Sequence, residues 1–113
     1  MHSILVVDDD PGIRDALALL LEDEGYVVLT APDGLAALEA VARDSPDLVI
    51  TDLYMPGLDG AGLIERLQSE WPDLPIFIVS AGIRASPPAR MPIVAKPFDA
   101  EHLLATVASL LAR

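Results

Sequence analysis

Acidic side chains stand directly after two apolar runs of this sequence. Asp8, Asp9 and Asp10 follow the first run, and Asp52 follows the third. Crowded carboxylates repel one another and favour a hard divalent cation, and Mg²⁺ is typically held by one or two carboxylates with waters and phosphate oxygens. The loop after Asp52 is rich in glycine and proline, and a carbonyl there, that of Tyr54, could complete the coordination. These residues therefore predict a magnesium site. Zinc is disfavoured because the set contains no His or Cys.

The apolar runs are typical of strands that alternate with helices. Short runs rich in β-branched residues occur five times, and leucines recur at helical spacing between them. The runs cover residues 4–7, 26–29, 48–51, 76–79 and 93–95. This alternation predicts a doubly wound α/β fold, in which helices cover both faces of a parallel sheet.

Capping residues mark the predicted helix ends. Asp10 can cap a helix that opens on proline, and Gly25 can end that helix. Asp33 and Asp99 can cap the second and the last helix. The connection over residues 81–92 holds three prolines, which disfavour a regular helix. The fourth helix of the series, which would occupy this connection, is therefore expected to be shortened or irregular.

The predicted strand ends bring polar residues together. In an open parallel α/β sheet, ligands bind beyond the carboxyl ends of the strands. The acidic pair Asp8 and Asp9 follows the first strand, and Asp52 follows the third. Ser80 follows the fourth, and Lys96 follows the fifth. The second strand delivers no comparable residue, which fits a position at the edge of the sheet. We therefore expect carboxylates, a hydroxyl and an ammonium group at one site.

Some candidate residues also have simpler interpretations. Asp10 is interpreted as a helix cap and not as a metal ligand. Taken singly, Ser80 is a common type of strand-end residue and Lys96 a common surface charge. His2 and His102 are interpreted as a terminal residue and a helix-surface residue. The case for a site therefore depends on the whole set and on its shared position in the fold.

Size and composition limit the range of functions. The 113 residues suffice for one core, so residues 1–113 are expected to form one domain. The formal net charge of −11 disfavours direct binding to nucleic acid, and an aromatic fraction of 4% supplies little stacking. The chain has no cysteine for a disulfide or thiolate site. Neither a signal peptide nor a membrane-spanning stretch is recognisable, which predicts a cytoplasmic protein with no membrane association.

Four segments resemble the receiver domains of bacterial two-component response regulators, which are CheY-like in fold. The segments are ILVVDDDP (4–11), TDLYMPGLDG (51–60), VSA (79–81) and AKPF (95–98). They occur in the expected order from one end of the chain to the other, each at a predicted strand end. The resemblance implies a flavodoxin-like five-stranded parallel sheet with the strand order 2-1-3-4-5.

The resemblance also implies a role for each residue at this edge. Asp52 would be the phosphoacceptor, Asp8 and Asp9 the Mg²⁺-binding pair, Ser80 the switch hydroxyl and Lys96 the phosphoryl-binding lysine. The donor would be a sensor histidine kinase or a histidine phosphotransfer protein, and the signal would pass to an unknown downstream protein. The chain would then be a phosphoacceptor regulatory domain, not an enzyme, although it assists its own phosphorylation and dephosphorylation.

Two features depart from the family pattern. Ile93 stands where receivers often carry an aromatic switch residue, three positions before Lys96. The segment from Ser80 to Lys96 is also shorter than usual by about a turn and a half of helix, at ~3.6 residues per turn. The usual dimerisation face should therefore be impaired, and we expect a monomer.

Three alternatives remain open on the sequence. A pseudo-receiver would bind partners independently of phosphorylation, which the complete set of Asp52, Ser80 and Lys96 argues against. A flavodoxin-like cofactor carrier would offer hydroxyls and backbone donors in its first loop, whereas this loop offers three carboxylates. A phosphohydrolase with an aspartyl intermediate needs an acid close behind its nucleophile, but Leu53 and Tyr54 follow here.

Overall fold

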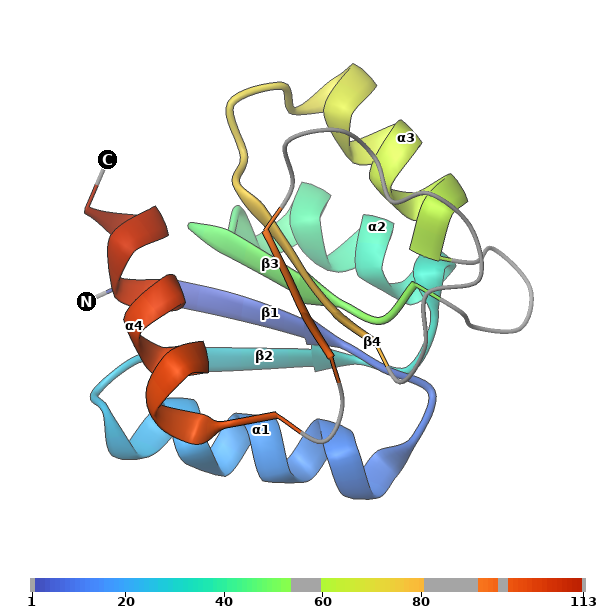
Figure 1. The fold of residues 1–113 in the computed structure, drawn as a ribbon. Coiled ribbons are helices and arrows are strands. Elements are labelled where there is room, and N and C mark those ends of the chain that lie inside the picture. The colour runs from blue at the N-terminus through green and yellow to red at the C-terminus, as the bar shows by residue number, and fades with distance from the viewer. Residues whose placement is uncertain (1, 54–59, 81–91, 96–97, 113) are drawn as a thin grey trace.

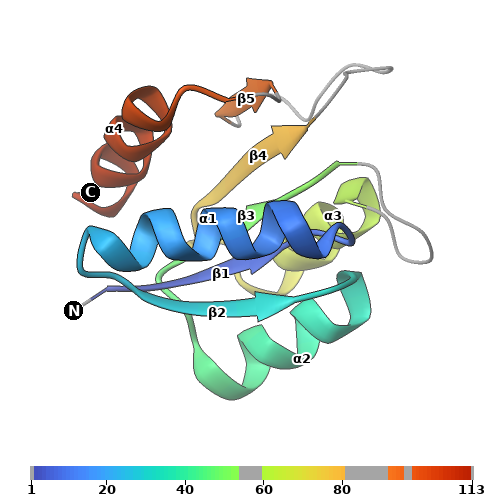
Figure 2. The ribbon, with the colours of Figure 1, turned by 90° about the horizontal axis from the view of Figure 1, so that it is seen from below.

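The sheet of this protein is fully parallel and has the predicted strand order. The computed structural model describes residues 2–53, 60–80, 92–95 and 98–112, except for the side chains of Ser80 and Ala95. The strands are β1 (Ser3–Val7), β2 (Val27–Ala31), β3 (Leu48–Thr51), β4 (Ile76–Ser80) and β5 (Ile93–Ala95). They lie in the order β2-β1-β3-β4-β5, and every neighbouring pair is parallel (Figure 1 and Figure 2). The flavodoxin-like topology predicted from the sequence is confirmed.

Helices cover both faces of the sheet. The helices in the described part of the chain are α1 (Pro11–Asp23), α2 (Gly34–Asp44), α3 (Gly60–Glu70) and α4 (Ala100–Leu111). α1 and α4 lie on one face, and α2 and α3 lie on the other (Figure 2). The label α4 thus denotes the last predicted helix. Residues 81–91, where the shortened fourth helix is predicted, lie outside the described residues.

Alternate residues of the central strands build two cores. Ile4 and Val6 of β1 pack with Leu17 of α1 and Leu103 of α4. Leu5, with Val7, packs on the opposite side against α2 and α3. Because successive strand residues point to opposite faces, a strand covered on both sides must be apolar throughout. This explains the continuous apolar runs that mark β1 and β3 in the sequence.

The helix caps predicted from the sequence are present. The Asp10 carboxylate accepts hydrogen bonds from the backbone N–H groups of Gly12 (2.9 Å) and Ile13 (3.3 Å). The Asp33 carboxylate accepts a hydrogen bond from the N–H of Ala36 (2.8 Å), and the Asp99 carboxylate accepts one from the N–H of Glu101 (2.9 Å). After α1 the chain reverses through Gly25 at φ +92°, a conformation that favours glycine.

β1 begins one residue earlier than predicted and β4 ends one residue later, and the second strand differs most from its predicted bounds. The sequence places the second strand at residues 26–29, whereas β2 runs from Val27 to Ala31. Its last two residues pair with Val6 and Val7 of β1. β2 lies at the edge of the sheet, where Val27 and Thr30 are exposed and only Ala31 is buried. Hydrophobicity therefore marks its ends poorly.

None of the helices in the described ranges is long and apolar enough to span a membrane.

Candidate functional site

The turn after β1 fixes Asp8 at the carboxyl edge of the sheet. The Asp8 N–H donates to the carbonyl of Ala31 at the end of β2 (3.2 Å). Its carboxylate accepts from the Asp10 N–H (2.9 Å), and its side chain is nearly buried at 2% exposure. A buried carboxylate is stable only when hydrogen bonds or charges compensate the loss of water. Asp8 is therefore held in place by the fold.

Asp9 and Asp10 differ in what their carboxylates do. Asp10 is exposed and both of its described side-chain bonds go to the first turn of α1, as its assignment to capping predicts. Asp9 is also exposed, and within the described residues its carboxylate makes no hydrogen bond. Asp9 is thus available to a ligand in a way that Asp10 is not.

Asp52 follows the central strand β3 and faces the same edge. Its N–H donates to the carbonyl of Val7 in β1 (3.1 Å), and the Thr51 hydroxyl donates to its carbonyl (2.9 Å). Asp52 is 9% exposed. Strand pairing thus places its carboxylate next to the turn that carries Asp8 and Asp9.

Gly60 allows α3 to begin against the residue after β3. Its N–H donates to the carbonyl of Leu53 (3.0 Å). A Cβ at this position would overlap the carbonyl oxygen of Asp52 and lie 2.5 Å from the Cα of Leu53. The structure thus gives a physical reason for the last glycine of the Gly- and Pro-rich segment that follows Asp52.

Three carboxylates form a cluster of the size that a metal ion needs. One ligand oxygen from each of Asp8, Asp9 and Asp52 can be chosen so that all lie within 4.8 Å of one another. Octahedral Mg²⁺ has oxygen ligands at about 2.1 Å, so two ligands are about 3 to 4 Å apart. Small side-chain adjustments would suffice, and an all-oxygen donor set is the one that Mg²⁺ prefers. The residues present therefore fit this ion.

Arg14 adds a cation that the sequence did not single out as a site residue. It is half-buried in α1, and its Nη1 donates to the carbonyl of Asp8 (3.0 Å). A signal for it exists in the sequence, since Arg14 is the only lysine or arginine before Arg43 and follows three consecutive aspartates. Its contact depends on how α1 leaves the turn and is therefore not visible in spacing alone.

The other predicted site residues are described in part or not at all. Ser80 ends β4, and its backbone lies beside Ala95 of β5, but its side chain is not among those described. Tyr54 and Lys96 lie outside the described residues. His102 is exposed on α4, as expected of a helix-surface residue.

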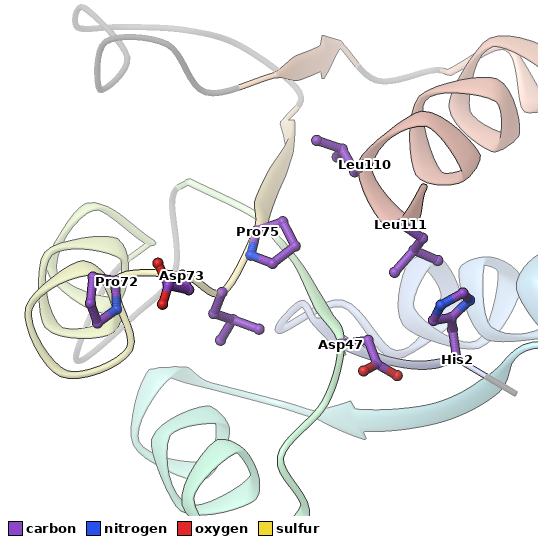
Figure 3. Close-up of a pocket in the computed structure, with 8 residues that line it drawn as sticks. His2, Asp47, Pro72, Asp73, Pro75, Leu110 and Leu111 are labelled. Atoms are coloured by element: carbon purple, nitrogen blue, oxygen red, sulfur yellow. The ribbon is translucent and has the colours of Figure 1, made fainter. Parts of the chain in front are cut away.

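A separate hollow opens at the other end of the sheet. It has a volume of about 410 Å³ and is lined by residues that precede β3 and β4 and by the end of α4 (Figure 3). His2 and Asp47 border it. Ligands of open parallel sheets gather at the carboxyl ends of the strands, whereas this hollow lies at the amino ends. We therefore place the functional site at the carboxylate cluster.

Comparison with known proteins points to one family. The family model described as response regulator receiver domain matches residues 4–108. The response regulator MprA of Mycobacterium leprae is 42% identical over 97% of this chain, and that of Mycobacterium ulcerans is 41% identical over the same share. The chain covers 51% and 50% of these two proteins, so it spans about half the length of the curated relatives that it matches.

Solved structures with the same fold are also response regulators. Protein TrrA of Thermotoga maritima, solved in complex with Mg²⁺ and BeF, has a TM-score of 0.90 and 33% identity, with 97% of this chain and 99% of that one covered. The chemotaxis protein CheY4 of Vibrio cholerae has a TM-score of 0.86 and 32% identity, with 97% and 98% covered. The MprA alignment of 119 positions is longer than this chain, so MprA carries residues that have no counterpart here.

Proposed function

The chain belongs to the family of response regulator receiver domains, and we propose that all 113 residues form one such domain, which accepts a phosphoryl group on Asp52. The donor is the phosphohistidine of a sensor histidine kinase or of a histidine phosphotransfer protein. The phosphorylated domain changes conformation and regulates a downstream protein in the cytoplasm. It assists its own phosphorylation and dephosphorylation.

The arrangement of the carboxylates is the observation that carries this proposal. Asp52 follows β3, which lies between β1 and β4, and its carboxylate groups with those of Asp8 and Asp9 at the carboxyl edge. Carboxylates gathered this closely repel one another, and such a cluster favours a hard divalent cation. The repulsion among these carboxylates is compensated when a divalent cation binds together with a phosphoryl group.

Mg²⁺ is the cofactor that this donor set supports. Asp8, Asp9 and Asp52, with the carbonyl of Tyr54, would hold the ion, and TrrA was solved with Mg²⁺ and BeF. When bound, the ion neutralises negative charge on the transferred phosphoryl group.

Asp52 supplies the nucleophile. One carboxylate oxygen attacks the phosphorus, and an O–P bond forms as the N–P bond of the phosphohistidine breaks. The electron pair of the N–P bond returns to the imidazole ring, which leaves as neutral imidazole because its other nitrogen carries a proton. The backbone hydrogen bonds of Asp52 hold the carboxylate in position, and position with electrostatics supplies most of the catalysis in this chemistry.

Lys96 and Ser80 act on the phosphoryl oxygens. The Lys96 ammonium neutralises charge that the carboxylates would otherwise repel. The Ser80 hydroxyl donates a hydrogen bond to a phosphoryl oxygen, so the end of β4 moves toward the site only when phosphate is present. This movement is the signal that the downstream partner reads.

Intact mass measurement tests the assignment of Asp52. Incubation with acetyl phosphate and Mg²⁺ should raise the mass by one phosphoryl group, and Asp52→Asn should abolish the increase. Asp73→Asn is the matched control, since Asp73 is exposed and borders the hollow at the opposite end of the sheet. Labelling of the Asp52→Asn variant would overturn the assignment. If neither acetyl phosphate nor a kinase labels the unmodified protein, the pseudo-receiver alternative is favoured instead.

A further inference from the structure

Arg14 is placed to control the geometry of the acidic turn. Its guanidinium donates from Nη1 to the carbonyl of Asp8 (3.0 Å), and the residue is half-buried. We propose that Arg14 is a positioning residue, which holds the peptide between Asp8 and Asp9 and so sets the affinity of the carboxylate cluster for Mg²⁺. This inference rests on the proposed function only in that it takes Mg²⁺ as the ligand of the cluster.

The hydrogen bonds of the turn show why this contact matters. The Asp8 N–H is bound to β2 through Ala31, and the Asp8 carboxylate is bound to the N–H of Asp10. The Asp8 carbonyl belongs to the same planar peptide as the N–H of Asp9, so its orientation fixes where the Asp9 backbone lies. Arg14 Nη1 donates a hydrogen bond to this Asp8 carbonyl.

Asp9 needs such support more than the other two ligands. Its side chain is exposed and makes no hydrogen bond within the described residues, so the backbone of the turn determines where it lies. Arg14 can provide that support because it is itself anchored: its own N–H donates to the carbonyl of Asp10 (3.0 Å) at the start of α1. The planar guanidinium then links the first turn of the helix to the peptide before Asp9.

Two effects of Arg14 on a cation site have opposite signs. Its positive charge repels Mg²⁺, so removal of the charge alone should strengthen binding. Its hydrogen bond orders a ligand, so removal of the bond should weaken binding, as loss of a residue that orients a metal ligand does by about 10- to 100-fold. The proposal requires that the second effect is the larger one.

Calorimetric titration with Mg²⁺ separates the two effects. Arg14→Met removes the charge and the hydrogen bond but keeps an unbranched stem that suits a helix. We expect weaker binding than in the unmodified protein at both low and high salt, by about tenfold at high salt, where the effect of the lost charge is screened, and by less at low salt. Arg66→Met removes an equal charge from α3, where Arg66 is paired with Glu70 (3.2 Å), and should leave the affinity nearly unchanged. Equal or tighter binding by Arg14→Met would overturn the proposal.

A measurement without metal keeps this test independent of the proposed function. In the metal-free protein, ¹⁵N relaxation should show lower order at the amides of Asp9 and Asp10 in Arg14→Met than in Arg66→Met. Unchanged relaxation at both amides would contradict the positioning role. If the unmodified protein itself binds no Mg²⁺, the proposed function fails, and the relaxation data still decide the role of Arg14.

Discussion

Three consecutive aspartates occupy three different environments in this fold. Asp8 is nearly buried and tied to the turn, Asp10 caps α1, and Asp9 is exposed with its carboxylate toward the cluster. Residue type alone does not distinguish them. The distinction comes from where β1 ends and where α1 begins, and these points can be read from the sequence because Pro11 marks the first residue of the helix.

Metal binding should therefore depend on Asp9 more than on Asp10. Asp9→Ala removes a carboxylate that no described hydrogen bond occupies, and it should abolish Mg²⁺-dependent phosphorylation by acetyl phosphate. Asp10→Ala should leave the Mg²⁺ dependence in place. Mg²⁺ titration of both variants checks this, and the roles are reversed if Asp10→Ala loses the ion while Asp9→Ala keeps it.

Gly60 should not tolerate even a methyl group. In Gly60→Ala the new Cβ would overlap the Asp52 carbonyl oxygen, and that neighbour is strand-end backbone that cannot move away cheaply. We expect a loss of about 1 to 3 kcal/mol in the free energy of unfolding, measured by urea denaturation. Gly12→Ala is the comparison, because its Cβ would meet only the Asp10 carboxylate at 3.3 Å. Equal stability of the two variants would show that the start of α3 can shift.

At the scale of elements, the cap of α1 contributes stability separately from the site. Asp10→Ala removes the acceptor for two backbone N–H groups and should lower the free energy of unfolding by about 0.5 to 2 kcal/mol. Asp10→Asn keeps a side-chain oxygen of equal capping strength and should lose much less. Urea denaturation of both variants measures the difference. A loss as large in Asp10→Asn as in Asp10→Ala would mean that charge, and not the cap, carries the effect.

Most elements were predictable because their signals are local. The apolar runs of β1 and β3 are buried on both faces. The N-caps of α1, α2 and α4 are Asp10, Asp33 and Asp99, each of which bonds to the first turn of its own helix. The end of β2 was not predictable, since it is set by pairing with β1 at an exposed edge.

The site could be predicted only as far as strand ends determine it. Spacing brought Asp8, Asp9 and Asp52 together because parallel strands end at one edge. The contacts of Arg14 with Asp8 and of Gly60 with Asp52 depend on how a helix leaves or approaches that edge. Such contacts between segments are tertiary, and no local pattern encodes them.

At the scale of the molecule, two features of the sequence depart from the usual receiver pattern: Ile93 and the short segment from Ser80 to Lys96. Ile93 opens β5 and is half-buried against the core on the α2 and α3 side, where it contacts apolar residues. It cannot act as an aromatic switch, because it has no ring to move between an exposed and a buried position.

The activated protein should therefore remain monomeric. A dimer through the connection before β5 needs a regular helix there, and residues 81–92 contain three prolines, two of them consecutive, each of which removes a backbone donor. We propose that the partner reads the phosphorylated state through the connection over residues 81–92, or through α1 and the segment after Lys96. Light scattering with Mg²⁺, with and without beryllofluoride as a phosphoryl mimic, should give the mass of one chain in both conditions. A shift to twice that mass, lost when residues 82–95 are altered, would show that this face still assembles and that the prolines do not prevent it.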